Sequence, residues 1–216
     1  MFETEAELVN TLKKALSKLN SSGYTEIFDE VSLGYGVADL VVSNFTNSTC
    51  RWVSNRFLLN SNDINIYSII ENEQGITLEK IANLTRQSFK LINKSLNKLT
   101  GFEYVINQEG KFFIKNYYQV SFENLFAIEA KLKNWKRALK QAYRYKWFAD
   151  YSYVVLDSCH IENAIKEIDL FRKYNVGLAS ISKDGELVRY FKPKREIPFD
   201  YKMRVLFSEK TKVSMN

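Results

Sequence analysis

The chain has 216 residues, a formal net charge of +6, 45% hydrophobic residues and 14% aromatic residues. This composition supplies enough apolar surface for one ordinary domain, or one domain with a small insert, and it excludes a disordered chain. The positive charge favours an anionic partner, with nucleic acid first, and a basic protein without such a partner is the alternative.

The reactive side chains exclude several classes of site. The chain has two distant cysteines, Cys50 and Cys159, and one histidine, His160. A structural zinc site therefore lacks ligands, and a disulfide framework is not expected. The acidic start MFETEAELVN does not resemble a signal peptide, and no apolar run approaches the roughly 20 residues that span a membrane. We expect a cytoplasmic protein without membrane contact.

The first elements are a helix and a hairpin. Apolar residues at helical spacing predict a helix over 2–19, and alternating patterns predict strands over 25–33 and 37–44. The following stretch, 45–61, is ambiguous, because its RWVSNRFLL run suits either a short helix or a strand.

The middle of the chain has another character. Periodic apolar residues predict three short helices, over 62–73, 76–85 and 86–100, and a Gly-containing turn predicts a hairpin over 104–114. Three helices followed by a hairpin is the element order of a winged helix-turn-helix.

The last part returns to alternating strands and helices. We expect strands over 125–132, 151–157, 176–182 and 186–192, and helices over 134–149, 160–175 and 201–210.

Three acid-x-lysine triplets occur: Glu129-Ala130-Lys131, Glu109-Gly110-Lys111 and Asp200-Tyr201-Lys202. Only the first ends an apolar run. Charged groups at the end of a buried strand must be paired, ligated or placed at a cleft. A strand-end salt bridge is one reading, and a functional cleft is the other.

Two further acids favour the cleft. Asp39 interrupts the apolar strand GVADLVV, and Glu5 interrupts the apolar stripe of the first helix, although Glu5 there also suits the helix dipole. Two strand carboxylates beside Lys131 suit Mg²⁺, which binds through one or two carboxylates plus substrate phosphate. The lysine would orient or activate the attacking water.

A strongly basic helix follows. Residues 129–148 hold seven lysines and arginines against Glu129 alone. Such a helix would hold a phosphate backbone against a metal. Gln141 and Tyr145 lie four residues apart on one face of it, where they can hydrogen-bond a substrate or a catalytic group.

In this order of elements and motifs the chain resembles the PD-(D/E)XK nuclease superfamily. Asp39 matches the motif aspartate, Glu129 and Lys131 match the E-x-K pair, and Glu5 matches the first-helix glutamate. Gln141 and Tyr145 match the helix motif of RecB-like members. The family proline is replaced by Ala38. The resemblance covers 1–44 and 119–182 and implies Mg²⁺, or Mn²⁺ as a substitute, held by Asp39, Glu129, the carbonyl of Ala130 and Glu5.

The insert resembles winged-helix DNA-binding domains, in which the third helix enters the major groove. The alternative is a protein-interaction winged helix with a solvated basic face. The residues that we expect to contact DNA, in the insert and the later basic helix, are Arg86, Gln87, Lys90, Asn93, Lys94, Lys98, Lys111, Lys136, Arg137, Lys140, Arg144 and Tyr145.

We therefore expect an α/β protein with a restriction-endonuclease-like mixed sheet flanked by helices. The expected division is a nuclease core in two parts, 1–58 and 119–216, with an inserted winged helix-turn-helix over 59–118. The expected function is a Mg²⁺-dependent DNA endonuclease with Asp39, Glu129, Lys131, Glu5 and Gln141 as catalytic residues. The expected partner is double-stranded DNA, and a homodimer is left open. The alternative is a non-catalytic winged-helix DNA-binding regulator.

Overall fold

The computed structural model describes residues 1–19, 24–34, 36–45 and 58–214. The chain forms two compact units. Unit 1 consists of Met1–Cys50 and Ser121–Tyr201, and unit 2 consists of Arg51–Val120 and Lys202–Asn216. Most of the stretch 45–61, which was expected to form either a short helix or a strand, lies outside the described residues.

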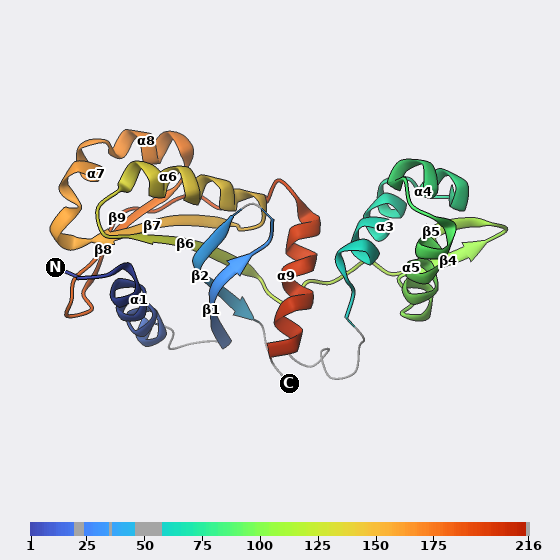
Figure 1. Cartoon of the computed structure of the whole chain (residues 1–216), viewed down its shortest axis with the longest axis horizontal. Coiled ribbons are helices and arrows are strands. Elements are labelled where there is room, and N and C mark those ends of the chain that lie inside the picture. The colour runs from blue at the N-terminus through green and yellow to red at the C-terminus, as the bar shows by residue number, and fades with distance from the viewer. Residues whose placement is uncertain (20–23, 35, 46–57, 215–216) are drawn as a thin grey trace. The chain divides into compact units, whose positions relative to one another are not determined.

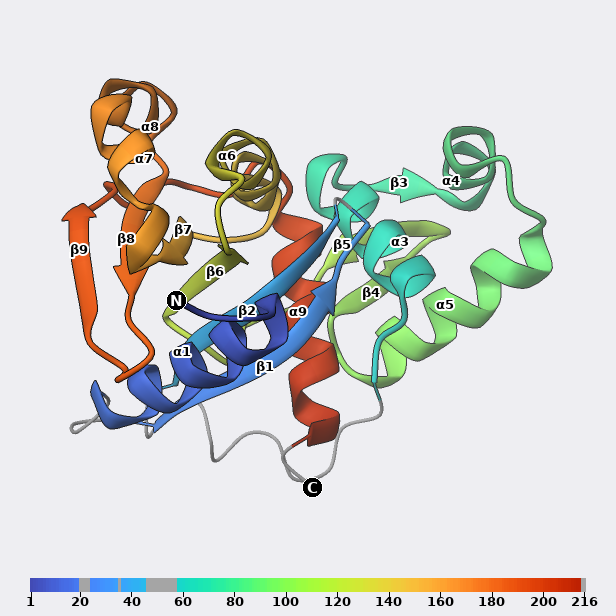
Figure 2. The same ribbon diagram turned by 60° about the vertical axis from the view of Figure 1, so that its left-hand side comes forward.

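Unit 1 is built on a mixed six-stranded sheet. Its strands lie in the order β1 (Tyr24–Ser32), β2 (Val37–Phe45), β6 (Asn124–Lys131), β7 (Tyr151–Asp157), β8 (Gly177–Ile181) and β9 (Leu187–Phe191). Figure 2 shows this sheet from β9 at one edge to β1 at the other. The central pairs β6–β7 and β7–β8 are parallel, and the outer pairs are antiparallel. The hairpin and the later strands expected from the sequence are confirmed.

Helices cover both faces of this sheet (Figure 1). One face carries α1 (Glu5–Leu19), and the other carries α6, α7 and α8. Their bounds, with two short 3-10 turns, are α6 (Trp135–Arg144), η1 (Tyr145–Trp147), η2 (Ser158–His160), α7 (Glu162–Lys166) and α8 (Ile168–Tyr174). The single helix expected over 160–175 is therefore wrong, because the chain leaves helical geometry at Glu167 and starts again.

The alternation of side chains along each strand decides which residues meet. Leu40 and Val42 of β2 and Ile128 and Ala130 of β6 pack with Leu12 and other residues of α1 in one core. Successive strand residues point to opposite faces of a sheet. Asp39, Glu129 and Lys131 alternate with these core residues along their strands, so they belong to the face that α6 covers.

Unit 2 contains three helices between residues 61 and 101, the last helix of the chain and a small antiparallel sheet of order β3-β5-β4. Its elements are α3 (Ser61–Asn72), β3 (Ile76–Thr77), α4 (Leu78–Thr85), α5 (Phe89–Gly101), β4 (Val105–Gln108) and β5 (Lys111–Ile114). Buried Ile70, Ile81, Ile92 and Leu99 belong to its core. Thr77 caps α4 by accepting a hydrogen bond from the Lys80 N–H, as its sequence position predicts. The expected three helices and hairpin are present, with the first two residues of 76–85 in a strand.

The structure differs from the expected division at the end of the chain. The last helix, α9 (Tyr201–Ser214), belongs from Lys202 onward to unit 2. Val205 is buried in the core of unit 2, and Glu209 accepts hydrogen bonds from the Leu59 N–H at 2.7 Å and from the Tyr118 hydroxyl. Assigning all of 119–216 to the nuclease-like core is therefore wrong, because the apolar face of α9 completes the other core.

None of the helices that the structure describes has both the length and the apolar character needed to cross a membrane.

Candidate functional site

The ammonium group of Lys131 gathers three carboxylates in unit 1. Its Nζ lies 3.0 Å from Glu129 Oε1, 3.0 Å from Glu5 Oε2 and 3.7 Å from Asp39 Oδ2. The three acids that the sequence singled out, from the first helix and two strands, thus each contact Lys131. The ion pairs that a strand-end salt bridge requires are therefore present.

The sheet register brings the two strand acids together. Leu40 of β2 pairs with Ile128 of β6 in an antiparallel register, so Asp39 and Glu129 are the next residues on each strand. The backbone N–H of Ala130 donates a hydrogen bond to Asp39 Oδ2 at 2.7 Å, which fixes that carboxylate against β6. Lys131, two residues after Glu129, lies on the same face of the sheet.

Tyr145 holds the second oxygen of Glu129. Its hydroxyl contacts Glu129 Oε2 and also lies 2.6 Å from the backbone carbonyl oxygen of Val37. A phenol has one proton to donate. When Tyr145 donates to the Val37 carbonyl, its contact with Glu129 requires a proton from Glu129. The side chain of Glu129 is 1% exposed, so the protein alone determines its surroundings.

Burial and the neighbouring charges have opposite effects on the pKa of Lys131, and several effects compete at Glu129 and Asp39. Burial raises the pKa of Glu129, against the hydrogen bond from Tyr145 and the charge of Lys131, and the charge of Asp39 raises it further. Burial likewise raises the pKa of Asp39 against the Ala130 N–H and Lys131. Burial alone would lower the pKa of Lys131, but the carboxylates of Glu5, Glu129 and Asp39 outweigh it and raise that pKa. The lysine therefore stays charged.

Glu5 reaches the cluster from the first turn of α1. Its side chain is 49% exposed, so the expectation that it lies in the buried stripe of that helix is wrong; the stripe is centred on Leu8 and Leu12. Asp157, at the end of β7, accepts a hydrogen bond from the Phe2 N–H at 2.9 Å and so anchors the start of α1. Sequence reasoning missed Asp157, although it ends an apolar strand just as Glu129 and Lys131 do.

Gln141 also lies on the face of α6 that leads to Tyr145, because the two residues are four apart. Its Oε1 is buried and has no hydrogen-bond partner within the described residues. A buried acceptor of this kind calls for a donor such as water. In the ranges that the structure describes, no three Cys, His, Asp or Glu side chains are arranged to hold a metal ion as they stand. The Lys131 ammonium lies among the carboxylates of the cluster.

The basic residues of α6 that are expected to contact DNA are exposed. Lys136, Arg137, Lys140 and Arg144 all lie at the surface. Tyr145 is 1% exposed and its hydroxyl faces Glu129, so its assignment as a DNA contact is wrong. Burial of the ring beside the carboxylate makes it a residue that positions Glu129.

In unit 2, most of the expected DNA contacts are also exposed: Arg86, Lys90, Asn93, Lys94 and Lys111. Gln87 is half-buried, and its Nε2 donates to Asn62 Oδ1 at 2.6 Å. Phe89, at the start of α5, is 51% exposed.

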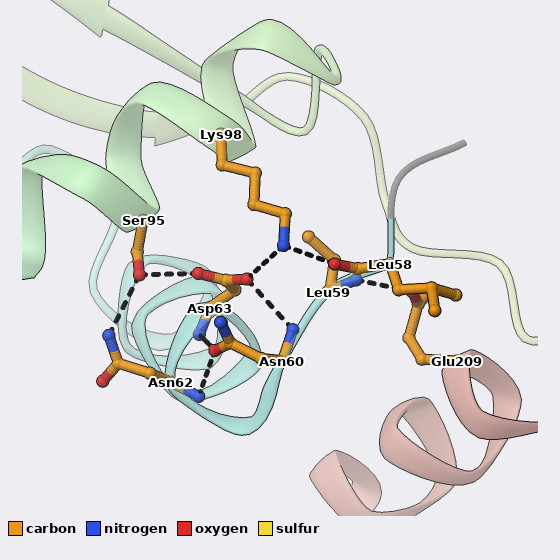
Figure 3. Close-up of polar contacts among 8 residues, drawn as sticks. All are labelled: Leu58, Leu59, Asn60, Asn62, Asp63, Ser95, Lys98 and Glu209. Atoms are coloured by element: carbon orange, nitrogen blue, oxygen red, sulfur yellow. Dashed lines mark hydrogen bonds and ion pairs between the residues drawn. The ribbon is translucent and has the colours of Figure 1, made fainter. Parts of the chain in front are cut away.

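Lys98 is likewise bonded to other residues of unit 2. Figure 3 shows its Nζ bonded to Asp63 Oδ2, at 2.8 Å, and to the Leu58 carbonyl oxygen. Asp63 is buried and accepts further hydrogen bonds from Ser95 Oγ at 2.6 Å and from the Asn60 N–H at 3.0 Å. The prediction that Lys98 contacts DNA is therefore wrong, because its charge neutralises a buried aspartate that caps α3.

Comparisons with known proteins identify no relative: no family model, no curated protein and no solved structure matches this chain.

Proposed function

We propose that this protein is a metal-dependent nuclease that hydrolyses DNA phosphodiester bonds and that unit 2 binds the DNA. The observation that carries the proposal is the contact of Lys131 with Glu5, Asp39 and Glu129 at 3.0–3.7 Å. A structural ion pair needs one acid for one lysine, whereas here three carboxyl groups face a single ammonium. An excess of carboxylates at one point favours a further cation.

The arrangement of unit 1 supports a restriction-endonuclease-like core. A helix carrying Glu5, a hairpin carrying Asp39, a strand carrying Glu129 and Lys131, and a helix with Gln141 followed by Tyr145 come in the order of the PD-(D/E)XK resemblance. The strands β2 and β6 are neighbours, and β6 and β7 are parallel. Ala38 in place of the family proline is the one departure within the motif.

The donor set fits a hard cation. Carboxylate and carbonyl oxygens are the ligands that Mg²⁺ prefers, and Asp39, Glu129, Glu5 and the Ala130 carbonyl would supply them. When bound, Mg²⁺ would polarise a phosphate oxygen and lower the pKa of a bound water. The half-exposed Glu5 side chain can rotate toward such an ion, and the buried acceptor of Gln141 can take a hydrogen bond from water.

The residues of the chain then have separate roles. Asp39 is fixed by the Ala130 N–H and Glu129 by Tyr145, so both carboxylates are oriented in advance. Lys131 is charged and only 13% exposed, a setting in which an ammonium stabilises developing negative charge better than it does in water. Its position among the acids suits a role beside the attacking water and the phosphate.

Unit 2 supports DNA placement. Its order of helices and strands is that of a winged helix-turn-helix, with α5 as the third helix and the β4–β5 turn as the wing. Exposed Lys90, Asn93 and Lys94 lie on α5, with Arg86 just before it. The same observation favours the second candidate, a DNA-binding regulator whose nuclease-like core does not cut.

Cleavage separates the two candidates. Supercoiled and linear DNA are incubated with Mg²⁺ or Mn²⁺ and the wild-type, Lys131→Ala and Lys111→Ala proteins. We expect Lys131→Ala to cut about 10²–10³-fold more slowly, the cost of removing one electrostatic group of a transition state. Its DNA affinity should change little, because one charge among many contributes little to ground-state binding.

Lys111→Ala is the matched control, since Lys111 stands in the triplet Glu109-Gly110-Lys111 of the β4–β5 turn. At saturating DNA it should cut at the wild-type rate, because a lost phosphate contact weakens DNA binding and leaves the reacting groups in place. No metal-dependent cleavage of any DNA or RNA by the wild-type protein would favour the regulator. Cleavage by Lys131→Ala at the wild-type rate would remove Glu129-Ala130-Lys131 from the active site.

A further inference from the structure

A cavity lies in unit 1 between α6 and α8. It measures 360 Å³, within the size range of small-molecule sites. Seven residues line it: Trp135, Lys136, Leu139, Lys140 and Tyr143 from α6, and Leu170 and Tyr174 from α8. Gln141 is two residues past Leu139, about 200° further around the helix. The cavity is therefore on a different side of α6 from Gln141 and Tyr145.

Aromatic rings form its walls. Tyr143 and Tyr174 meet edge to face with centroids 5.5 Å apart, and they are 42% and 38% exposed. Trp135 is 8% exposed and packs on the buried Phe171, with centroids 5.9 Å apart, so its ring is fixed from behind. Large rings with exposed surface at a cavity suit a flat partner that stacks on them.

The charge at this cavity is positive. Both charged residues of its lining are lysines, and Lys136 Nζ lies 5.5 Å from the centre of the Trp135 ring. Lys173 Nζ lies 5.6 Å from the centre of the Tyr174 ring. Aromatic rings that take bases, beside cations that take phosphates, are the pair of features by which proteins bind single-stranded nucleic acid.

We propose that this cavity stacks an unpaired base of a single-stranded nucleic acid and that Lys136 and Lys140 hold the phosphates beside it. The strand must be single because the bases of a duplex already stack on each other, which hides the faces that the rings would contact. The inference rests on the proposed function only in taking nucleic acid as the ligand. A strand held here would lie on the basic helix that follows Glu129 and Lys131.

The test compares two strands of equal charge. Fluorescence anisotropy measures binding of a labelled oligothymidylate and of an abasic strand with the same number of phosphates, in EDTA so that nothing is cut. We expect the wild-type protein to prefer the oligothymidylate. The double variant Tyr143→Ala/Tyr174→Ala should lose about 5- to 150-fold in affinity for that strand, the usual effect of removing a stacking partner, and bind the abasic strand as before.

Two control variants complete the design. Trp147→Ala removes another exposed ring of unit 1, which lies outside this cavity and packs on Phe199, and should keep the preference for bases. Lys136→Ala/Lys140→Ala should lower the affinity for the two strands by the same factor, because both strands carry the same number of phosphates.

Equal wild-type affinity for the two strands would overturn the proposal, as would a preference that survives in the double tyrosine variant. Binding of an acidic peptide that depends on Tyr143, without binding of oligothymidylate, would make the cavity a peptide site instead. Because no step requires cleavage, an inactive protein that prefers bases through Tyr143 would refute the nuclease and leave this inference standing.

Discussion

At the residue scale, the clearest feature is the different use of chemically similar lysines. Lys131 and Lys98 are each held by carboxylates, whereas Lys90 and Lys94 are exposed. A lysine among buried acids stays charged and localised, and an exposed one is a mobile, strongly hydrated cation. A lysine held by acids can stabilise charge at one fixed position, whereas an exposed lysine can adjust its position to contact a phosphate backbone.

Two tyrosines allow a test of how Glu129 is positioned. We expect Tyr145→Phe to lower the free energy of unfolding by about 1–2 kcal/mol, because a buried carboxyl group loses its hydrogen bond. It should also lower the rate of cleavage at saturating Mg²⁺, since Glu129 is then less well oriented. Urea unfolding and single-turnover cleavage measure the two effects.

Tyr118→Phe is the matched control. The Tyr118 hydroxyl donates to Glu209, another buried glutamate, but in unit 2. The control should lose a similar stability and keep the single-turnover rate of wild type. Equal cleavage by both variants would show that the Tyr145 hydroxyl serves stability alone.

At the scale of elements, one ion pair joins α3 and α5. Asp63 of α3 is buried and Lys98 of α5 is 27% exposed. Lys98→Met should destabilise unit 2 by about 3 kcal/mol, because it leaves an unpaired buried charge. Lys94→Met, on the same helix but exposed, should change stability by less than about 0.5 kcal/mol. Thermal or urea unfolding monitored in unit 2 measures both, and equal stabilities would refute the role of the pair.

The same ion pair predicts a pH dependence. Burial alone would raise the pKa of Asp63, but Lys98, Ser95 and the Asn60 N–H outweigh it and lower that pKa. A carboxyl group with a lowered folded pKa stabilises the fold above its unfolded pKa of about 3.9, and this stabilisation is lost as the pH falls through the folded pKa.

We therefore expect the stability difference between wild type and Asp63→Asn to be full at neutral pH and to shrink below about pH 4. Urea unfolding across a pH series measures this difference. A constant difference down to pH 2 would mean that Asp63 does not titrate in this way.

At the scale of the whole molecule, the proposed function assigns DNA binding and hydrolysis to different units. The exposed cations of α5 would supply DNA affinity, and the carboxylate cluster of unit 1 would supply hydrolysis. Neither unit is one continuous segment, because unit 1 closes after the insert and α9 returns to unit 2. Each core therefore depends on residues distant in the sequence.

Replacement of Arg86, Lys90 and Lys94 by alanine tests the division. Each lost phosphate contact should lower the slope of log affinity against log salt by about 0.9. DNA binding measured from low to moderate salt should thus show weaker binding and a shallower slope, without loss of stability, because these side chains are exposed. Unchanged affinity and slope would show that unit 2 binds something other than DNA.

Local patterns were sufficient for much of this protein. Apolar periodicity predicted the first helix, the hairpin, the strands of the sheet and the three helices of unit 2, because burying one face of an element requires that spacing. Charged residues inside apolar strands, Asp39 and Glu129, identified the cluster around Lys131, since such groups need partners. The interrupted apolar stripe of the first helix added Glu5, and the four-residue spacing within the basic helix added Gln141 and Tyr145.

The tertiary structure decided which partner each side chain has. Nothing local indicates that Lys98 neutralises Asp63, which acid the Tyr145 hydroxyl contacts, or that Trp135 and Tyr174 line one cavity. The same residue types at the same spacing also suit a solvated surface. Only the packing of distant segments decides whether such a residue is buried against a partner or faces solvent. The last helix is the largest instance. Its amphipathic pattern shows that one face must be buried, but which core buries that face depends on contacts with distant residues. Glu209 contacts Tyr118, 91 residues away, and Leu59, 150 residues away.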